Sequence, residues 1–387
     1  VIARKNLFDL TDPGWLHITN RCVRRAFLCG HDYATQQNHE HRKYWIEHRL
    51  AQLCRAFCVE VAAFAVMSNH LHLVVRMAPE RVVPLSDEAL IDRWLIAYPG
   101  WQPKAPEDVS SGQLGGNNID KTDPLPRVTL REALLADGNK IADIRQRLSS
   151  ISWFMSALSQ PIARWSNHED GCTGRFWEGR YRSDPIRDQE GLLAVMAYVD
   201  LNPIRAGLAA TPEASDFTSA QQRIEMLLAY RQEMLGQHPA LADQARLLPP
   251  ANELAERLDW LAPIREITGM SYVNRRADED EESQEQAEPN ERVSLNELNE
   301  WDYLSIVEET GRYIQAGKKG AIPNHLPELL QRIGNFDPQP WLTSMATPNS
   351  LRGTIGRPKA CKHEAQRRGI TFVRIPKIFQ RSRPPPD

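Results

Sequence analysis

The segment VMSNHLHLVV, at residues 66–75, constrains the fold of this chain more than any other. It places His70 and His72 two residues apart inside an apolar, partly β-branched run of the kind that forms strands. Alternate side chains of a strand point to the same face, so both imidazoles project from one side of a sheet and Leu71 from the other. The segment therefore predicts a strand whose two histidines are able to share one metal ion.

A second pair of histidines has the same spacing in a different setting. His39 and His41 precede a stretch, residues 44–57, in which apolar residues recur at helical spacing. Side chains two residues apart on a helix point in widely different directions. We therefore expect His39 and His41 to be solvated rather than to share a ligand.

The patterns around the histidine strand predict an α+β fold. Alternating runs indicate strands, and apolar stripes at helical spacing indicate helices, one interrupted by Pro161 and another ended by Pro203. The strands are expected at residues 15–23, 59–67, 66–75 and 174–186, and the helices at residues 44–57, 151–165 and 188–208. The order β-α-β-β-α-β-α is that of a ferredoxin-like split β-α-β core with one further helix.

Changes in composition divide the chain further. Residues 84–127 are rich in Gly, Pro, Asn and Asp, which is typical of an insertion or mobile loop, and short helices are expected at its far side. We expect a core domain at residues 1–217, with this insertion at about residues 84–150. It is followed by a helical and acidic linker region at 218–291, a small helical module at 292–345 and a basic tail at 346–387.

The charge distribution matters more than the formal net charge of −3. Residues 277–291 concentrate acidic side chains, whereas residues 352–383 contain ten Lys or Arg and one Glu. The average therefore hides a basic tail that suits nucleic acid. No apolar stretch approaches the length needed to cross a bilayer, and the six cysteines lack paired CxxC spacing, so we expect a cytoplasmic, bacterial protein with reduced thiols and no membrane partner.

The segment AYVDLNP supplies a second group of chemically capable residues. Tyr198 and Asn202 are four residues apart in the predicted helix, so they lie on one face of it. Asn202 precedes Pro203 and is expected at the carbonyl-rich helix end, where a cation is favoured. A divalent ion held by two imidazoles and this amide oxygen would sit one helical turn from the phenol. The alternative is that Tyr198 is an ordinary core tyrosine.

Two arginine-rich segments suggest a nucleic-acid face. In GRFWEGRYRSDP, arginines alternate with aromatic residues, the mixture expected of a surface that neutralises phosphates and stacks bases. The segment NRCVRRAF, beside the first strand, adds three more arginines. The candidates are Arg21, Arg24, Arg25, Arg175, Trp177, Arg180, Tyr181 and Arg182. The alternative is a solvated edge strand over a buried tryptophan.

Three segments together resemble a known family. MSNHLHLVV, GRFWEGRYRS and AYVDLNPIRAGL, in this order, look like the HUH single-tyrosine transposases, and most like the REP-associated tyrosine transposases related to insertion-sequence 200-like elements. The resemblance covers roughly residues 4–217, less the insertion. The later segment YLSIVEETGRYIQAGKKGAIP resembles the C-terminal extension of longer members.

The resemblance implies an HUH-type endonuclease fold and a transesterification on single-stranded DNA. His70 and His72 match the two metal-binding histidines, Tyr198 matches the nucleophile, and Asn202 matches the third metal ligand. Tyr198 would form a 5′-phosphotyrosine and release a 3′-OH, with Mg²⁺ or Mn²⁺ offsetting the charge at the phosphate. The implied partner is single-stranded DNA with hairpin-forming palindromic repeats, bound by a monomer or a homodimer.

Three alternatives stay open. Tyr181 is a rival nucleophile within the arginine-rich segment. The second alternative is a catalytically silent DNA- or RNA-binding regulatory protein on the same scaffold, since RNA-recognition modules share this topology. The third alternative is a structural zinc protein, in which the histidines join Cys54, Cys58 or Cys172.

Overall fold

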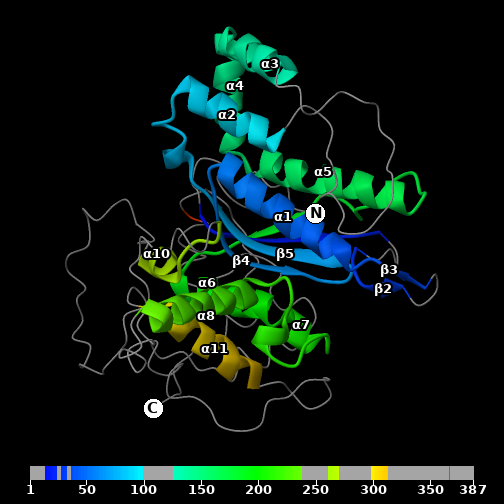
Figure 1. Ribbon diagram of the computed structural model, residues 1–387, viewed down its shortest axis with the longest axis vertical. Helices are drawn as coiled ribbons and strands as arrows, with labels where there is room; N and C mark the ends of the chain where they lie inside the picture. The colour runs from blue at the N-terminus through cyan, green and yellow to red at the C-terminus, as the bar shows by residue number, and fades with distance from the viewer. Residues whose placement is uncertain are drawn as a thin grey trace.

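The computed structural model combines helices with an antiparallel sheet (Figure 1). It describes residues 14–23, 28–32, 36–98, 125–237, 260–269, 298–312 and 366. The main sheet has the strand order β4-β5-β1-β6, and every neighbouring pair is antiparallel. Its strands are β1 (Leu16–Arg21), β4 (Val59–Val66), β5 (His70–Met77) and β6 (Arg182–Pro185), and a separate hairpin joins β2 (His31–Asp32) to β3 (Gln37–Asn38).

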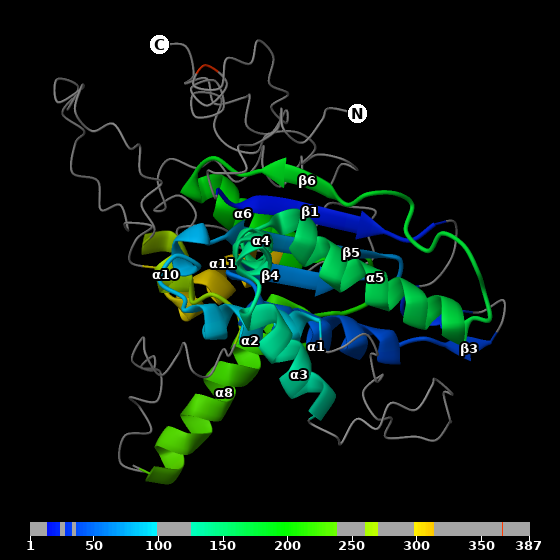
Figure 2. The same cartoon turned by 90° about the horizontal axis from the view of Figure 1, so that it is seen from above.

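Helices cover both faces of the sheet, as Figures 1 and 2 show from two directions. One face carries α1 (His41–Ala56) and α5 (Ile151–Glu169), with α2 (Asp87–Ala97), α3 (Leu125–Leu135) and α4 (Gly138–Leu148) beyond them. The other side carries α6 (Gln189–Asp200), α7 (Asn202–Arg205), α8 (Ser219–Gln237), α10 (Ile264–Gly269) and α11 (Glu300–Arg312). Short 3₁₀ turns lie at Pro79–Arg81 and Pro212–Ala214.

Strand β5 shows how the sequence sorts its side chains between the two faces. Leu71 and Leu73 join the apolar core that α1 and α5 cover, whereas Val74 joins the core that α6 and α11 cover. Because successive side chains alternate, His72 shares the α6 face with Val74. Both faces of the sheet are therefore covered, and the histidines point toward α6.

A bulge in β4 adapts the sheet to α6. Val61 and Ala63 pair with consecutive residues of β5, so Ala62 is an extra residue in the strand. The carbonyl of Ala62 accepts a hydrogen bond from Arg223 Nη2 of α8 at 3.0 Å. After the bulge, the small side chains of Ala63 and Ala65 face α6, which allows that helix to lie close to the sheet.

The structure corrects three expectations about the elements. Of the strand expected at residues 174–186, the structure has β6 and an isolated antiparallel bridge of Trp177 with Cys22, because Gly174, at φ +104°, and its neighbours form a loop bonded to α5. The insertion is not structureless throughout, since α2 begins at Asp87 behind a Ser86 N-cap whose Oγ accepts from the Ala89 amide. Pro161 does not interrupt its helix, which runs without a break through α5.

An arginine compensates for the proline inside α5. Proline has no N–H, so Pro161 cannot donate to the carbonyl of Ala157, four residues earlier. Arg49 of α1 supplies a donor instead, with Nε 3.2 Å from that oxygen, and its Nη2 bonds the carbonyl of Ala97 at the end of α2. Arg49 therefore ties α1 to α5 and to the insertion.

This arrangement predicts a coupling between the two positions. Arg49→Met leaves two buried carbonyls without that donor and should destabilise the fold by about 1–3 kcal/mol for each group. Pro161→Ala returns an N–H to Ala157, so it should stabilise the Arg49→Met protein more than the original one. Urea denaturation of the single and double variants measures the coupling energy. Additive effects would contradict this account.

The C-terminal helices share a core with the rest of the described chain. Leu298, Ile306 and Val307 pack with α6 in the same apolar cluster. The segments that lead into α8 and α10 border the free edge of β4, through bridges of Ala65 with Thr218 and of Val61 with Leu261. None of the helices in the described ranges is long and apolar enough to cross a bilayer.

Several expectations lie outside the described residues. They concern the acidic run at 277–291, the second helix of the 292–345 module and, apart from residue 366, the basic tail at 346–387. The domain boundaries expected from composition therefore stay predictions.

Candidate active site

The two histidines of β5 lie next to polar residues of β1. The strands pair so that His72 is opposite Thr19 and His70 is opposite Arg21. The imidazole centroids of His70 and His72 are 4.7 Å apart, and both rings come from the same face of the sheet. Strand alternation therefore brings the two rings together, as the sequence predicted.

A third histidine, His17, was missed from the sequence. Its Nε2 lies 3.0 Å from Nδ1 of His72, and the two rings stack with centroids 5.2 Å apart. Thr19 Oγ1 lies 3.4 Å from the same Nδ1. The signal was present in WLHITNRCV, where His17 and Thr19 alternate with apolar residues just as the β5 histidines do.

Helix α6 places Tyr198 against this cluster. Its ring centroid lies 5.7 Å from that of His72 and 6.0 Å from that of His17, both edge to face. The rival tyrosine, Tyr181, packs instead against the core on the α5 side, with its hydroxyl 3.4 Å from Ser152 Oγ of α5. Of the two tyrosines, Tyr198 is the one beside the histidines.

Asn202 lies differently from expectation. Helix α6 ends at Asp200, and Asn202 begins the short helix α7, so Pro203 falls in the first turn of α7 and does not end the helix of Tyr198. The Asn202 side-chain amide donates to the carbonyl of Tyr198 at 2.9 Å and to that of Val199 at 3.4 Å. It caps the end of α6 through Nδ2, and its Oδ1 is the atom that remains for a ligand.

Burial keeps the histidines neutral. Burial, and then the charges of Arg182 and His70, lower the pKa of His17 to about 3. Burial, followed by the charge of Arg21, lowers the pKa of His70 to about 4, and burial holds the pKa of His72 well below its usual range. Burial raises the pKa of Tyr198, while Arg205 and Arg182 oppose that rise.

These shifts predict a loss of stability in acid. In the unfolded chain a histidine binds a proton near pH 6.5, whereas folded His17 resists protonation down to about pH 3, so the unfolded state binds more protons in this window. The stability is complete above pH 6.5 and falls as the pH drops through the window, by roughly 3–5 kcal/mol for His17 alone. Urea unfolding at a series of pH values, without metal, measures this. As the pH drops, the free energy of unfolding should fall less steeply for His17→Gln than for the original protein. An equal fall would contradict the assignment.

The hydrogen bonds around the two histidines fit a metal site. His70 Nδ1 donates to Asn69 Oδ1 at 2.6 Å, which leaves the lone pair of Nε2 for a ligand. In His72 the Nδ1 position is likewise engaged, by His17. Metal-binding histidines ordinarily use one ring nitrogen and anchor the other in this way, and they must be neutral. The residues present therefore fit a divalent cation.

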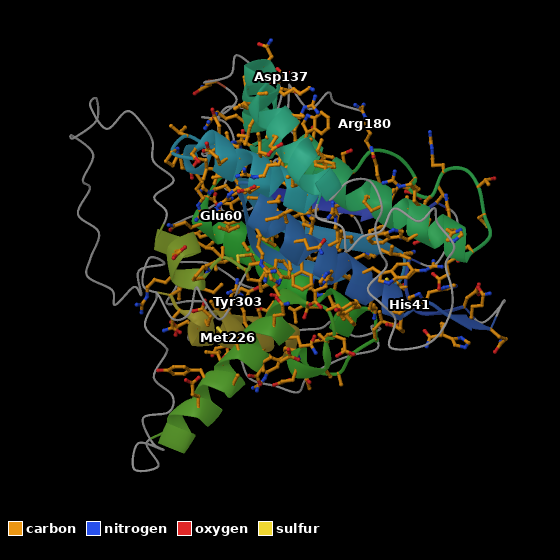
Figure 3. All side chains as sticks on the ribbon, turned by 45° about the horizontal axis from the view of Figure 1, so that its top comes forward. His41, Glu60, Asp137, Arg180, Met226 and Tyr303 are labelled. Carbon is orange, nitrogen blue, oxygen red and sulfur yellow. The ribbon has the colours of Figure 1, made fainter. Side chains whose placement is uncertain are left out.

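The predicted arginine face is only partly assembled. Arg21 and Arg182 lie near the histidines, and Arg182 also pairs with Asp184 at 2.7 Å. Arg175 and Arg180 are exposed in the loop before β6, where Arg180 lies at the periphery of the molecule (Figure 3). Trp177 and Tyr181 both pack against the core on the α5 side of the sheet. Trp177 also donates from Nε1 to the Ser159 carbonyl at 2.8 Å. Arg24 and Arg25 lie outside the described residues.

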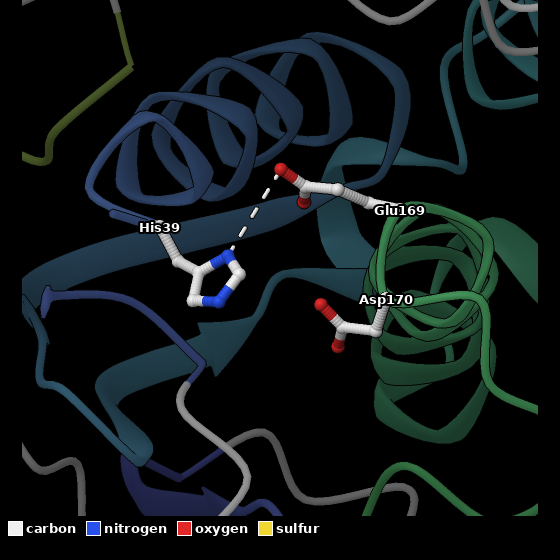
Figure 4. Close-up of side chains that lie close together, drawn as sticks. All are labelled: His39, Glu169 and Asp170. Atoms are coloured by element: carbon white, nitrogen blue, oxygen red, sulfur yellow. Dashed lines mark ion pairs between the residues drawn. The ribbon is translucent and has the colours of Figure 1, made fainter. Parts of the chain in front are cut away.

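The other histidine pair corrects a further expectation. His39 precedes α1 and is only 6 % exposed. It is buried because it turns toward Glu169 and Asp170 at the end of α5 (Figure 4). Its Nδ1 is 4.0 Å from Glu169 Oε1, and His41, which is exposed as expected, pairs with that oxygen at 2.8 Å. Fully buried Arg42 pairs with both carboxylates. Because both carboxylates already pair with this guanidinium, and Glu169 also with His41, the group is better explained as an ion-pair network than as a metal centre.

The cysteines do not join the histidines. Cys54 and Cys58 pack with the core on the α1 side, whereas His72 faces α6, and Cys172 is exposed after α5. The structural zinc alternative therefore lacks its thiolate ligands at this site.

Comparisons with known proteins add little to this geometry. No protein-family model matches the sequence, and no curated protein matches it. A solved structure of a REP-associated tyrosine transposase bound to a REP hairpin aligns with 55% of this chain and 80% of its own, at 14% sequence identity and a TM-score of 0.26.

Proposed function

We propose that this chain is a metal-dependent strand transferase of the HUH transposase type, acting on single-stranded DNA at hairpin-forming repeats. The observation that carries the proposal is the contact of Tyr198 with the His72 ring, since His72 lies beside His70 and these two imidazoles are suited to hold a divalent cation. The strand order β4-β5-β1-β6 supports a ferredoxin-like split unit, and we assign the catalytic unit to residues 1–217, with the insertion at 84–150.

The chemical step is a transesterification by Tyr198. Its Oη forms a bond to the phosphorus of one phosphodiester as the bond from phosphorus to the 3′-oxygen breaks. The net proton passes from the phenol to the released 3′-hydroxyl, so the products are a 5′-phosphotyrosine and a 3′-OH. The phosphoester bond energy is retained in the adduct, which allows the 3′-OH of another strand to reverse the step.

His70 and His72 would hold the divalent cation, with Oδ1 of Asn202 as the third ligand. When bound, Mg²⁺ or Mn²⁺ supplies charge neutralisation at the phosphate, and nitrogen ligands favour Mn²⁺. His17 anchors His72 through the bond to Nδ1, which fixes the orientation of that ring. Arg21 and Arg182 add positive charge beside the histidines, where a DNA backbone would pass.

The test is formation of a covalent protein–DNA adduct. Purified protein is incubated with labelled single-stranded DNA carrying the palindromic repeats that flank its gene, with Mg²⁺, Mn²⁺ or a chelator. We expect an adduct that survives denaturing gel electrophoresis, depends on the metal and leaves DNA with a free 3′-OH. Tight hairpin binding without an adduct under either metal would contradict the proposal and leave the catalytically silent DNA-binding alternative. Binding to single-stranded RNA instead would favour an RNA-binding regulator.

A further inference from the structure

Arg205 of α7 lies beside the phenol and has an unsatisfied donor. Its guanidinium carbon is 5.4 Å from the centroid of the Tyr198 ring, above the ring face. Its Nη1 is buried and forms no hydrogen bond within the described part of the chain. A buried charged donor without an acceptor is costly, so a ligand that supplies an acceptor there is favoured.

Buried arginines elsewhere in the described chain are held by protein acceptors, although Nε of Arg223 also lacks one. Arg42 is paired with Glu169 and Asp170, and Arg223 with Glu300. Arg49 donates to two main-chain carbonyls and to Gln52. Arg205 differs because no hydrogen bond or ion pair joins its guanidinium to a carbonyl or carboxylate of the described residues.

The position of Arg205 limits what the missing acceptor can be. The His72 and Tyr198 rings pack edge to face at an interplanar angle of 90°, and the Arg205 guanidinium lies over the ring of the same phenol. An anion that reaches both Tyr198 Oη and Arg205 Nη1 is thus close to the reacting atoms. Guanidinium N–H groups bind phosphate oxygens strongly, because both partners are charged.

We infer that Arg205 binds a non-bridging oxygen of the DNA phosphodiester that lies at Tyr198. This inference rests on the proposed function and deepens it, because it adds a residue that touches the substrate phosphate beside Tyr198. Arg205 needs no metal for this contact, so the contact is measurable in the presence of a chelator.

The experiment measures binding of metal-free protein to labelled single-stranded repeat DNA by fluorescence anisotropy. A series of oligonucleotides carries one neutral methylphosphonate linkage each, moved along the strand beside the hairpin. In the original protein one linkage should matter most, and its neutralisation should weaken binding about 10- to 100-fold. In Arg205→Gln the same neutralisation should not weaken binding further. The slope of log affinity against log salt concentration should become shallower by the equivalent of about one phosphate contact.

Two further variants control the result. Arg131→Gln removes a 35 % exposed arginine that pairs with Asp92 on the α5 side of the sheet, and it should keep the full linkage profile. Arg205→Lys keeps the charge without the planar fork, so it should keep a reduced effect at the same linkage. If Arg205→Gln does not fold, as judged by its melting temperature, an unchanged profile for Arg205→Lys overturns the inference. The inference is also overturned if Arg205→Gln weakens binding to every oligonucleotide by the same factor.

If the original protein does not bind the DNA, the proposed function is contradicted, but the binding of an anion by Arg205 is still to be tested. Inorganic phosphate then serves as the probe, since a ligand that binds the folded state raises the melting temperature. Phosphate should stabilise the original protein and Arg131→Gln more than Arg205→Lys. Equal stabilisation of all three overturns the inference. An adduct formed by a protein with no linkage-specific effect of Arg205 would leave the proposed function standing and remove this role.

Discussion

We expect Tyr198→Phe to abolish the covalent adduct with single-stranded repeat DNA and to leave hairpin binding close to that of the original protein. The change removes one oxygen, and phenylalanine keeps the ring that packs edge to face against His72 and His17. Because the hydroxyl is the only nucleophilic atom removed, we expect a loss of at least about 10³-fold in the rate of adduct formation. Denaturing gels of a time course measure the rate, and anisotropy measures the binding.

The matched control for Tyr198 is Tyr181→Phe. Tyr181 lies on the α5 side of the sheet and contacts Ser152, so losing its hydroxyl should leave the adduct rate within about twofold. A normal rate of adduct formation in Tyr198→Phe would refute the proposed site. Loss of the adduct in Tyr181→Phe alone would identify Tyr181 as the nucleophile.

Glu300→Gln should cost about 3–5 kcal/mol of folding stability, the range for breaking a buried ion pair from one side. Arg223 is fully buried, and its Nη1 lies 3.3 Å from Glu300 Oε1, which also accepts from the Ile264 amide at 2.7 Å. Glutamine keeps the size and an acceptor but removes the negative charge, so it leaves the Arg223 charge unpaired in the core. Urea denaturation measures the loss.

Two comparisons separate the buried pair from general effects on α11. Glu308→Gln changes an exposed residue of the same helix, paired with Arg312 at 2.6 Å, and should cost less than about 1 kcal/mol. Replacing both Arg223 and Glu300 with Met leaves no unpaired charge, but it also leaves the carbonyls of Ala62 and Ala262 and the Ile264 amide without these partners, so it should recover only part of the loss. A Glu300→Gln loss no larger than that of Glu308→Gln would contradict this account.

The same region ties the C-terminal helix to the site. Tyr303 of α11, labelled in Figure 3, donates from Oη to Asp200 Oδ2 at 2.5 Å. Asp200 is buried two residues after Tyr198, and its other oxygen accepts from Ser219 Oγ and the Ala220 amide. The end of the helix that carries Tyr198 is therefore anchored by α8 and α11, a role that the separate C-terminal module expected from composition did not suggest.

The strands at the centre of the sheet could be read from the sequence because their signal is local. In β5, apolar Leu71 and Leu73 alternate with the histidines, and both sets lie on the faces that the alternation requires. The loop at residues 174–181 shows where this reading failed. Its arginines and aromatics alternate like a strand, but tertiary packing decides its conformation, since Trp177 bonds to Ser159 of α5.

Which side chains share one face of a strand or one face of a helix could be predicted from the sequence, because those periods are set by backbone geometry. The sequence thereby placed His70 with His72 and predicted the helix of Tyr198. The packing of α6 on the histidine face, and the contacts that bring His17 and Arg205 to the cluster, became visible only in the folded chain. The same holds for His39, which is buried against α5 rather than solvated. These contacts join residues far apart in the chain, and their energy depends on burial and on neighbouring charges that no local pattern contains.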